Sequence, residues 1–148
     1  MLSNKAKYGL KALIHLADNR GHPVQSAEIA EAEGLPKKFL DAILLEIKNL
    51  GVITSKKGKG GGYQLARPPD TIALGQVLRA LDGSFAPVPC VSRSAYARCS
   101  DCRDEDGCAV RPVMQEVRDA IAGVLDKRTL GDMLLMRKTK DFFLAYDI

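Results

Sequence analysis

The four cysteines of this 148-residue chain fall within one short segment, and the sequence has no other cysteine. They are Cys90, Cys99, Cys102 and Cys108, in the pattern Cys-x8-Cys-x2-Cys-x5-Cys. The residues between them are mostly polar or charged and form no apolar face that a core could bury. Thiolates that converge on a metal would give such a segment a fixed structure. The pattern therefore predicts a metal-binding or redox-active site.

Three chemistries fit this spacing. An iron–sulfur cluster is held by thiolates that converge on it. Structural zinc also favours four thiolates, and Cys99-x2-Cys102 has the spacing of one half-site, but Cys90 and Cys108 do not form a second close pair. A reversible disulfide between two thiols is the third alternative. The remaining interpretation is a set of unrelated reduced thiols on a surface loop.

The elements that must position this loop begin with three predicted helices. The first starts at Ser3 or Asn4 and ends before the turn at 19–23. A short second helix covers 27–33, with Gly34 at its end. The third runs from Pro36 to about Leu50, with an apolar stripe that starts at Phe39.

After the third helix the periodicity of the apolar residues changes from helical to strand-like. This predicts a β-hairpin, with strands over 52–55 and 63–66. Two helices joined by a tight turn and followed by a basic hairpin describe a winged helix-turn-helix. We expect the third helix to enter the major groove with the residues of its first turns, Pro36, Lys37, Lys38 and Asp41. The hairpin tip interleaves glycines with Lys56, Lys57 and Lys59, which suit phosphate contacts beside a minor groove.

Two other interpretations of the glycine-rich tip were weighed. A nucleotide-binding loop fails because there is no Walker pattern and a strand, rather than a helix, follows the glycines. A flexible solvated turn is the other alternative, and the helical pair directly upstream favours the DNA-binding wing over it. The charge distribution agrees, since residues 1–67 carry 11 Lys and Arg against 6 Asp and Glu, and residues 68–148 carry 11 against 12.

The second half of the chain predicts one helix over 71–82, the cysteine loop, a long helix over 112–127 and a short helix over 129–136. An apolar tail at 142–146 is expected to dock. The long helix has a wide apolar stripe, which we expect to pack partly on its copy in a second subunit. The fold class is therefore mainly α with a small β-hairpin: a winged helix-turn-helix DNA-binding domain over 1–83, a cysteine-rich sensor loop over 84–110, and a dimerisation helix with a C-terminal tail over 111–148.

Enzymatic, membrane and secreted classes are not expected. There is no nucleophile–base pair, no pocket-forming pair of carboxylates and no HExxH motif, so neither catalysis nor a small-molecule substrate is predicted. His15 and His22 fit structural roles. No apolar run reaches the roughly 20 residues of a membrane span. No signal peptide is evident, so we expect a cytoplasmic protein with reduced thiols.

Several short segments resemble one family. They are Ser3-x-Lys5-x-x-Tyr8-Gly9-Leu10, Leu50-Gly51-Val52-Ile53, Lys57-Gly58-x-Gly60-Gly61-Gly62-Tyr63 and Thr129-Leu130-Gly131-Asp132. They are similar to the bacterial Rrf-type winged-helix regulators, the family of the IscR-, NsrR- and RirA-like proteins. The resemblance covers about residues 1–135. It implies a homodimeric transcription factor with a long dimerisation helix and, in one branch, an iron–sulfur cluster on the preceding loop.

The resemblance also suggests a ligand set. Cys102-x5-Cys108 keeps the family spacing, Cys90 lies where a first cysteine is expected, and Cys99 is an addition. One subgroup has a histidine three residues after the last cysteine, where this chain has Arg111. The simplest interpretation is that Cys99 replaces the non-cysteine ligand, so that all four thiolates hold a [2Fe–2S] or [4Fe–4S] cluster.

The function that follows is a dimeric regulator that binds a palindromic operator in double-stranded DNA. It would sense redox, iron or nitric oxide status through the cluster. The alternatives are a disulfide-forming regulator without a cluster and a zinc-stabilised DNA-binding protein.

Overall fold

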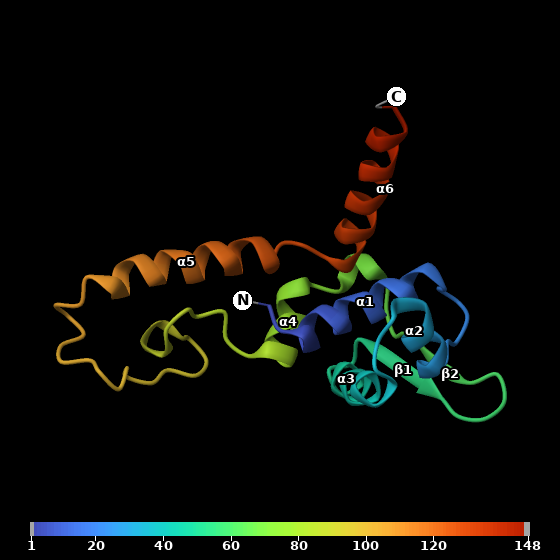
Figure 1. Cartoon of the computed structure of the whole chain (residues 1–148), viewed down its shortest axis with the longest axis horizontal. Helices are drawn as coiled ribbons and strands as arrows, with labels where there is room; N and C mark the ends of the chain where they lie inside the picture. The colour runs from blue at the N-terminus through green and yellow to red at the C-terminus, as the bar shows by residue number, and fades with distance from the viewer. Residues whose placement is uncertain (1, 147–148) are drawn as a thin grey trace.

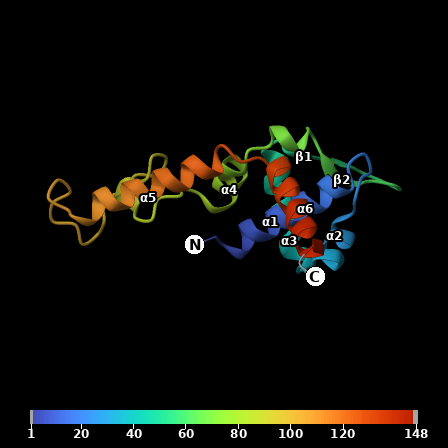
Figure 2. The ribbon, with the colours of Figure 1, turned by 90° about the horizontal axis from the view of Figure 1, so that it is seen from above.

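The structure, a computed structural model, describes residues 2–146. This part of the chain contains six α-helices and a two-stranded antiparallel sheet. For residues 140–146 only the helical backbone is described. A body formed by α1 to α4 and the hairpin lies at one end of the molecule, α5 and the cysteine loop extend to one side, and α6 rises from the body (Figures 1 and 2). This arrangement confirms the predicted fold class, a mainly helical winged helix-turn-helix with a long additional helix.

The body is built on helices whose ends the sequence specifies. Helix α1 covers Asn4–Asp18, and the Ser3 hydroxyl caps it by accepting a hydrogen bond from the backbone N–H of Ala6 at 3.0 Å. Helix α2 covers Ser26–Glu33 and ends at Gly34, which has a φ of 63°. Helices α3, Lys37–Asn49, and α4, Leu74–Asp82, pack against α1. The largest fully buried side chains are Leu13, Leu16, Ile29, Leu40, Ile43, Leu44, Ile47, Ile53, Ile72 and Leu130.

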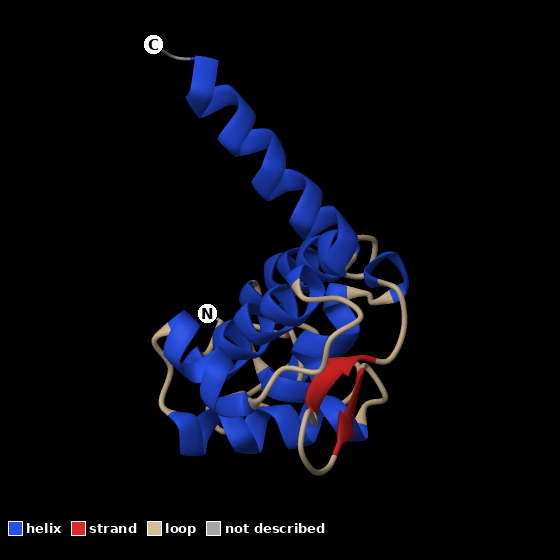
Figure 3. Ribbon diagram, turned by 90° about the vertical axis from the view of Figure 1, so that its right-hand side faces the viewer, coloured by secondary structure: helices blue, strands red, loops and turns tan. Residues whose placement is uncertain are grey.

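The hairpin consists of β1, Ile53–Lys56, and β2, Gly62–Leu65, and lies at one edge of the body (Figure 3). A backbone bridge ties it to the segment before α2, because Val24 and Tyr63 exchange two N–H···O hydrogen bonds of 2.8 Å. Only glycine fits at position 62, since its φ is +144° and a Cβ there would lie 2.5 Å from the carbonyl of Val24. The base of the hairpin is therefore fixed to the helical body.

Helix α5 covers Val110–Leu125 and none of its residues is buried. Helix α6 covers Leu130–Tyr146 and starts with a capping box. The backbone N–H of Asp132 donates to the Thr129 hydroxyl at 3.1 Å, and the backbone N–H of Thr129 donates to the Asp132 carboxylate at 2.9 Å. Leu130 is fully buried and anchors this end of α6 to the body.

Two expectations about these elements need correction. The last helix was predicted to end at 136, but it continues to Tyr146 because no glycine or proline interrupts the sequence after Gly131. The predicted docking of the 142–146 tail concerns side chains outside the described residues.

Phe39 was predicted in the buried stripe of α3, but it is 41% exposed. Its ring meets the Tyr8 ring edge to face, with 5.8 Å between the ring centroids. No helix in the described part of the chain is long and apolar enough to cross a membrane.

Candidate functional site

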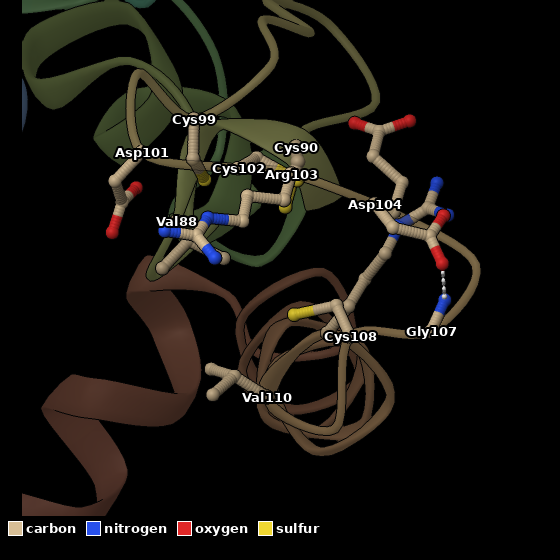
Figure 4. Close-up of a pocket in the computed structure, with 12 residues that line it drawn as sticks. Val88, Cys90, Cys99, Asp101, Cys102, Arg103, Asp104, Gly107, Cys108 and Val110 are labelled. Atoms are coloured by element: carbon tan, nitrogen blue, oxygen red, sulfur yellow. Dashed lines mark hydrogen bonds between the residues drawn. The ribbon is translucent and has the colours of Figure 1, made fainter.

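All four cysteines line one pocket of about 460 Å³ (Figure 4). Cys90 lies in a short 3-10 helix, η2, Pro89–Val91. The other three lie on the loop that follows, which leads into the first turn of α5. The pocket is lined by Val88, Cys90, Cys99, Asp101, Cys102, Arg103, Asp104, Glu105, Gly107, Cys108, Val110 and Arg111.

Local turns give the loop its shape. The backbone N–H of Ala97 donates to the carbonyl of Pro89 at 3.3 Å, which brings the chain back toward η2 just before Cys99. The N–H of Cys102 donates to the carbonyl of Cys99 at 3.1 Å. The Asp104 carboxylate accepts from the N–H of Gly107 at 3.0 Å, so the turn before Cys108 is held by a side chain. These contacts explain how a polar segment gathers its cysteines around one space.

The thiols differ in their surroundings. Cys90 is only 7% exposed, whereas Cys99, Cys102 and Cys108 are half-buried. Burial raises the pKa of the Cys90 thiol, and a hydrogen bond with Cys99 raises it further, while the positive charge of Arg111 acts in the opposite direction. The Cys90 thiol therefore favours its neutral form, and Cys99 is among the groups whose effect reaches it.

The pocket offers four thiols as candidate ligands for a metal group. Four sulfur ligands around one pocket suit an iron–sulfur cluster or zinc. The Nε of Arg111 is buried and lacks a hydrogen-bond partner within the described residues, which suits an acceptor inside the pocket. However, no three His, Cys, Asp or Glu side chains among those residues lie close enough together to hold a metal ion. The donor chemistry fits a four-thiolate group, and the loop must contract for the sulfurs to share one.

Helix α5 holds the Cys90 segment directly. The Arg118 guanidinium donates from Nη1 to the carbonyl oxygen of Val91 at 2.6 Å, and its side chain is only 14% exposed. Arg118 and Arg93 both pair with the Asp119 carboxylate, at 2.8 and 3.0 Å. Sequence reasoning missed this tether, because an arginine on a helix gives no signal for a backbone partner 27 residues earlier.

The start of α3 presents the residues predicted to read DNA. Pro36 precedes the helix, and the Pro36, Lys37 and Lys38 side chains are exposed. Lys37 Nζ lies 2.9 Å from an oxygen of Asp41, one helical turn away. Hydrogen bonds from Lys37 and from Ser26 hold the pKa of Asp41 below its usual value, so this carboxylate remains a hydrogen-bond acceptor at neutral pH.

The three wing lysines are also exposed. Lys56 ends β1, and Lys57 and Lys59 lie in the tip, where Gly58 and Gly60 have φ values of 91° and 74°. Helix α3 contacts β1, and both lie along the same edge of the body (Figure 1). The predicted DNA-contacting residues therefore occur on neighbouring elements.

Helix α5 carries a row of exposed apolar side chains at heptad-like spacing. These residues are Val110, Val113, Val117, Ile121 and Val124. Between 37 and 60% of the surface of each is exposed. An exposed apolar row of this kind indicates an interaction surface.

Comparisons with known proteins match this architecture. The model of the Rrf2 family, described as an iron-dependent transcriptional regulator, matches residues 2–135. A putative HTH-type transcriptional regulator, rrf2-like, from Rhodobacter capsulatus is 44% identical over 138 residues, which are 90% of this chain and 92% of the relative. The structure of CymR, the global cysteine regulator of Bacillus subtilis, superposes with a TM-score of 0.73 at 33% identity and covers 90% of this chain and 95% of its own. T. potens IscR gives a TM-score of 0.72 at 31% identity, with coverage of 93% and 88%.

Proposed function

The chain belongs to the Rrf2 family of transcriptional regulators, and from this premise we propose that it is a homodimer that binds a palindromic operator and senses iron, redox or nitric oxide status through an iron–sulfur cluster. Its relatives are named as transcriptional regulators, so its role is regulatory and not enzymatic. Residues 1–83 would bind DNA, 84–110 would form the sensor loop, and 111–148 would hold the dimer together.

The observation that carries the cluster proposal is the meeting of all four cysteines in one pocket. Cys90, Cys99, Cys102 and Cys108 would supply the four ligands of a [2Fe–2S] or [4Fe–4S] cluster. The family description as iron-dependent favours iron over zinc. When bound, the cluster would supply a group that gains or loses an electron, or is lost, when the cell's redox state changes. The chain's part is to hold it beside α5.

For DNA binding, the two copies of α3 would lie in successive major grooves of the operator. Pro36, Lys37, Lys38 and Asp41 would face the groove, with Lys38 at a phosphate or base edge and Asp41 accepting from a cytosine amino group. The wing residues Lys56, Lys57 and Lys59 would contact phosphates beside the adjacent minor groove.

For the dimer, the apolar row of α5 would pack on the same row of a second copy. The row runs from Val110, in the first turn of α5, to Val124, in its last turn. Because the first turn of α5 also lines the cysteine pocket, a change in the loop would alter the packing that sets the distance between the two recognition helices.

The cluster proposal is tested by purifying the protein without oxygen and measuring iron, acid-labile sulfide and zinc per chain, together with visible absorption. Each cysteine is then changed to serine, with Ser100→Ala in the same loop as the control. We expect a coloured wild type and control, and loss of iron and colour in each cysteine variant. A colourless wild type that holds one tightly bound zinc would instead support the zinc-stabilised alternative.

One pair of cysteines favours a second candidate, a disulfide switch. Cys90 and Cys99 line the same pocket, and the Cys99 side chain acts to raise the pKa of the Cys90 thiol. A two-electron oxidant such as a peroxide would join them, with loss of two protons and two electrons from the pair. A colourless, zinc-free protein in which these two thiols alone become resistant to alkylation after peroxide treatment would favour this mechanism.

A further inference from the structure

Arg111 occupies a distinctive position at the junction of the cysteine pocket and α5. It is the second residue of that helix and lines the pocket together with the four cysteines. Its Nε is shielded from solvent and has no hydrogen-bond partner among the described residues. A buried N–H without an acceptor is costly, so native proteins rarely leave one unpaired.

The neighbours of Arg111 show which acceptor is missing. Arg111 shares the pocket with the four cysteines and with the carboxylates of Asp101, Asp104 and Glu105. Glu105 also lines the pocket, but its Oε1 already accepts a hydrogen bond from the Tyr96 hydroxyl at 2.7 Å. Within the described residues Arg111 forms no ion pair with a carboxylate. Both carboxylate oxygens of Asp104 accept from backbone N–H groups, at 3.1 and 3.0 Å. The acceptors that remain in the pocket include the cysteine sulfurs.

We propose that Arg111 donates a hydrogen bond from Nε to a sulfur of the bound cluster and thereby raises the cluster's reduction potential. This inference rests on the proposed function. A cluster with four thiolate ligands carries net negative charge, and its reduction potential depends on that charge and on hydrogen bonds to its sulfurs. One-electron reduction adds one further negative charge, which a buried guanidinium stabilises more than the oxidised state. Arg111 itself remains protonated throughout.

A merely structural role predicts a different outcome. Arg111 lies in the first turn of α5, so its removal also disturbs the helix start. Arg111→Lys retains a positive charge but loses the planar Nε–H donor, and Arg111→Met loses both. Arg93→Met is the matched control, because Arg93 is an exposed residue of the same loop outside the pocket lining and its removal changes the net charge of the loop equally.

The test is an anaerobic titration of each reconstituted protein with dithionite, which supplies the electron, followed by visible absorption. We expect Arg111→Met to reduce the equilibrium constant for one-electron reduction at least about tenfold, a fall of about 59 mV. Arg111→Lys should shift the potential in the same direction by less, and Arg93→Met should leave it unchanged. If Arg111→Met cannot retain a cluster, Arg111→Lys decides.

Two results overturn the proposal in distinguishable ways. A wild-type protein that takes up no cluster refutes the proposed function and, with it, this inference. A wild type that takes up a cluster, while both Arg111 variants that retain one keep the wild-type potential and spectrum, refutes the role of Arg111 alone.

Discussion

The guanidinium of Arg118 donates a hydrogen bond to the carbonyl oxygen of Val91 across 2.6 Å. Val91 follows Cys90 directly, so the most buried of the four thiols is attached to the middle of α5 through one backbone carbonyl. The loop reaches α5 a second time where Cys108 leads into its first turn. The cysteine pocket is therefore connected to α5 at two points.

We expect Arg118→Met to weaken the coupling between the cysteine site and DNA. Coupling between two sites is typically about 1–3 kcal/mol, or roughly 5–150-fold in affinity. Without the tether, the ratio of operator affinities between loaded and cluster-free protein should fall toward one, while iron content is retained. Fluorescence anisotropy of a labelled operator measures the ratio.

The matched control is Arg93→Met. This variant loses only the ion pair between the exposed side chains of Arg93 and Asp119, the carboxylate that also pairs with Arg118. This variant should keep the wild-type ratio. An Arg118→Met protein that also keeps the full ratio would show that the tether does not carry the coupling.

The wing makes a prediction about salt. Lys57→Ala should weaken binding to all sequences and reduce the slope of log affinity against log salt concentration by about one, because one phosphate contact is lost. Lys127→Ala, an exposed lysine after α5, serves as the control and should leave the slope unchanged. Titrations at several salt concentrations provide the slopes. An unchanged slope for Lys57→Ala would remove the wing from the DNA interface.

Asp41 should control sequence preference. Asp41→Asn replaces an acceptor with a group that also donates, so discrimination for cytosine at one operator position should fall about tenfold. Because the pKa of Asp41 is held below its usual value, the carboxylate is ionised across the neutral range, and the wild-type preference should not change between about pH 6 and 8.

Asp41→Asn also frees Lys37 from its ion pair, so Lys37→Met is measured in parallel. Lys37→Met should weaken binding without changing the preferred base. Selection from a randomised operator library distinguishes the two effects, and an unaltered preference in Asp41→Asn would contradict base contact by this residue.

The apolar row of α5 should hold the dimer. Val117→Glu places a charge near the middle of the row, and burying an unpaired charge costs several kcal/mol, so the protein should become monomeric in sedimentation velocity. Gly123→Glu adds the same charge on another face of the helix, where a Cβ meets no atom, and should remain dimeric. A dimeric Val117→Glu protein would show that another surface forms the dimer.

Much of the fold followed from local patterns because several helix ends carry their own signal. Ser3 and Gly34 mark helix ends that the structure confirms, and the glycine-rich tip between two short strands predicted the hairpin. Phe39 was misplaced because helical spacing alone puts it on the stripe of Leu40 and Ile43, whereas it is exposed at the first turn of α3.

The site was predictable only in part. Clustering in the sequence placed the cysteines on one loop, and the structure brings them to one pocket. The contacts that position this pocket join distant residues, as in Arg118 with Val91, and nothing in the local sequence specifies them. The buried Nε of Arg111 was equally hidden, because a sequence shows an arginine at the start of a helix but not the direction of its donors.

The central claim is that the group held by the cysteine loop controls DNA binding, and one titration tests it most directly. A single operator is titrated with cluster-loaded and cluster-free protein at the same salt concentration, with both shown to be dimeric. We expect the loaded form to bind at least about fivefold more tightly, the lower end of typical coupling between sites. Equal affinities of the two forms would contradict the claim and would leave the cysteine pocket with a structural role only.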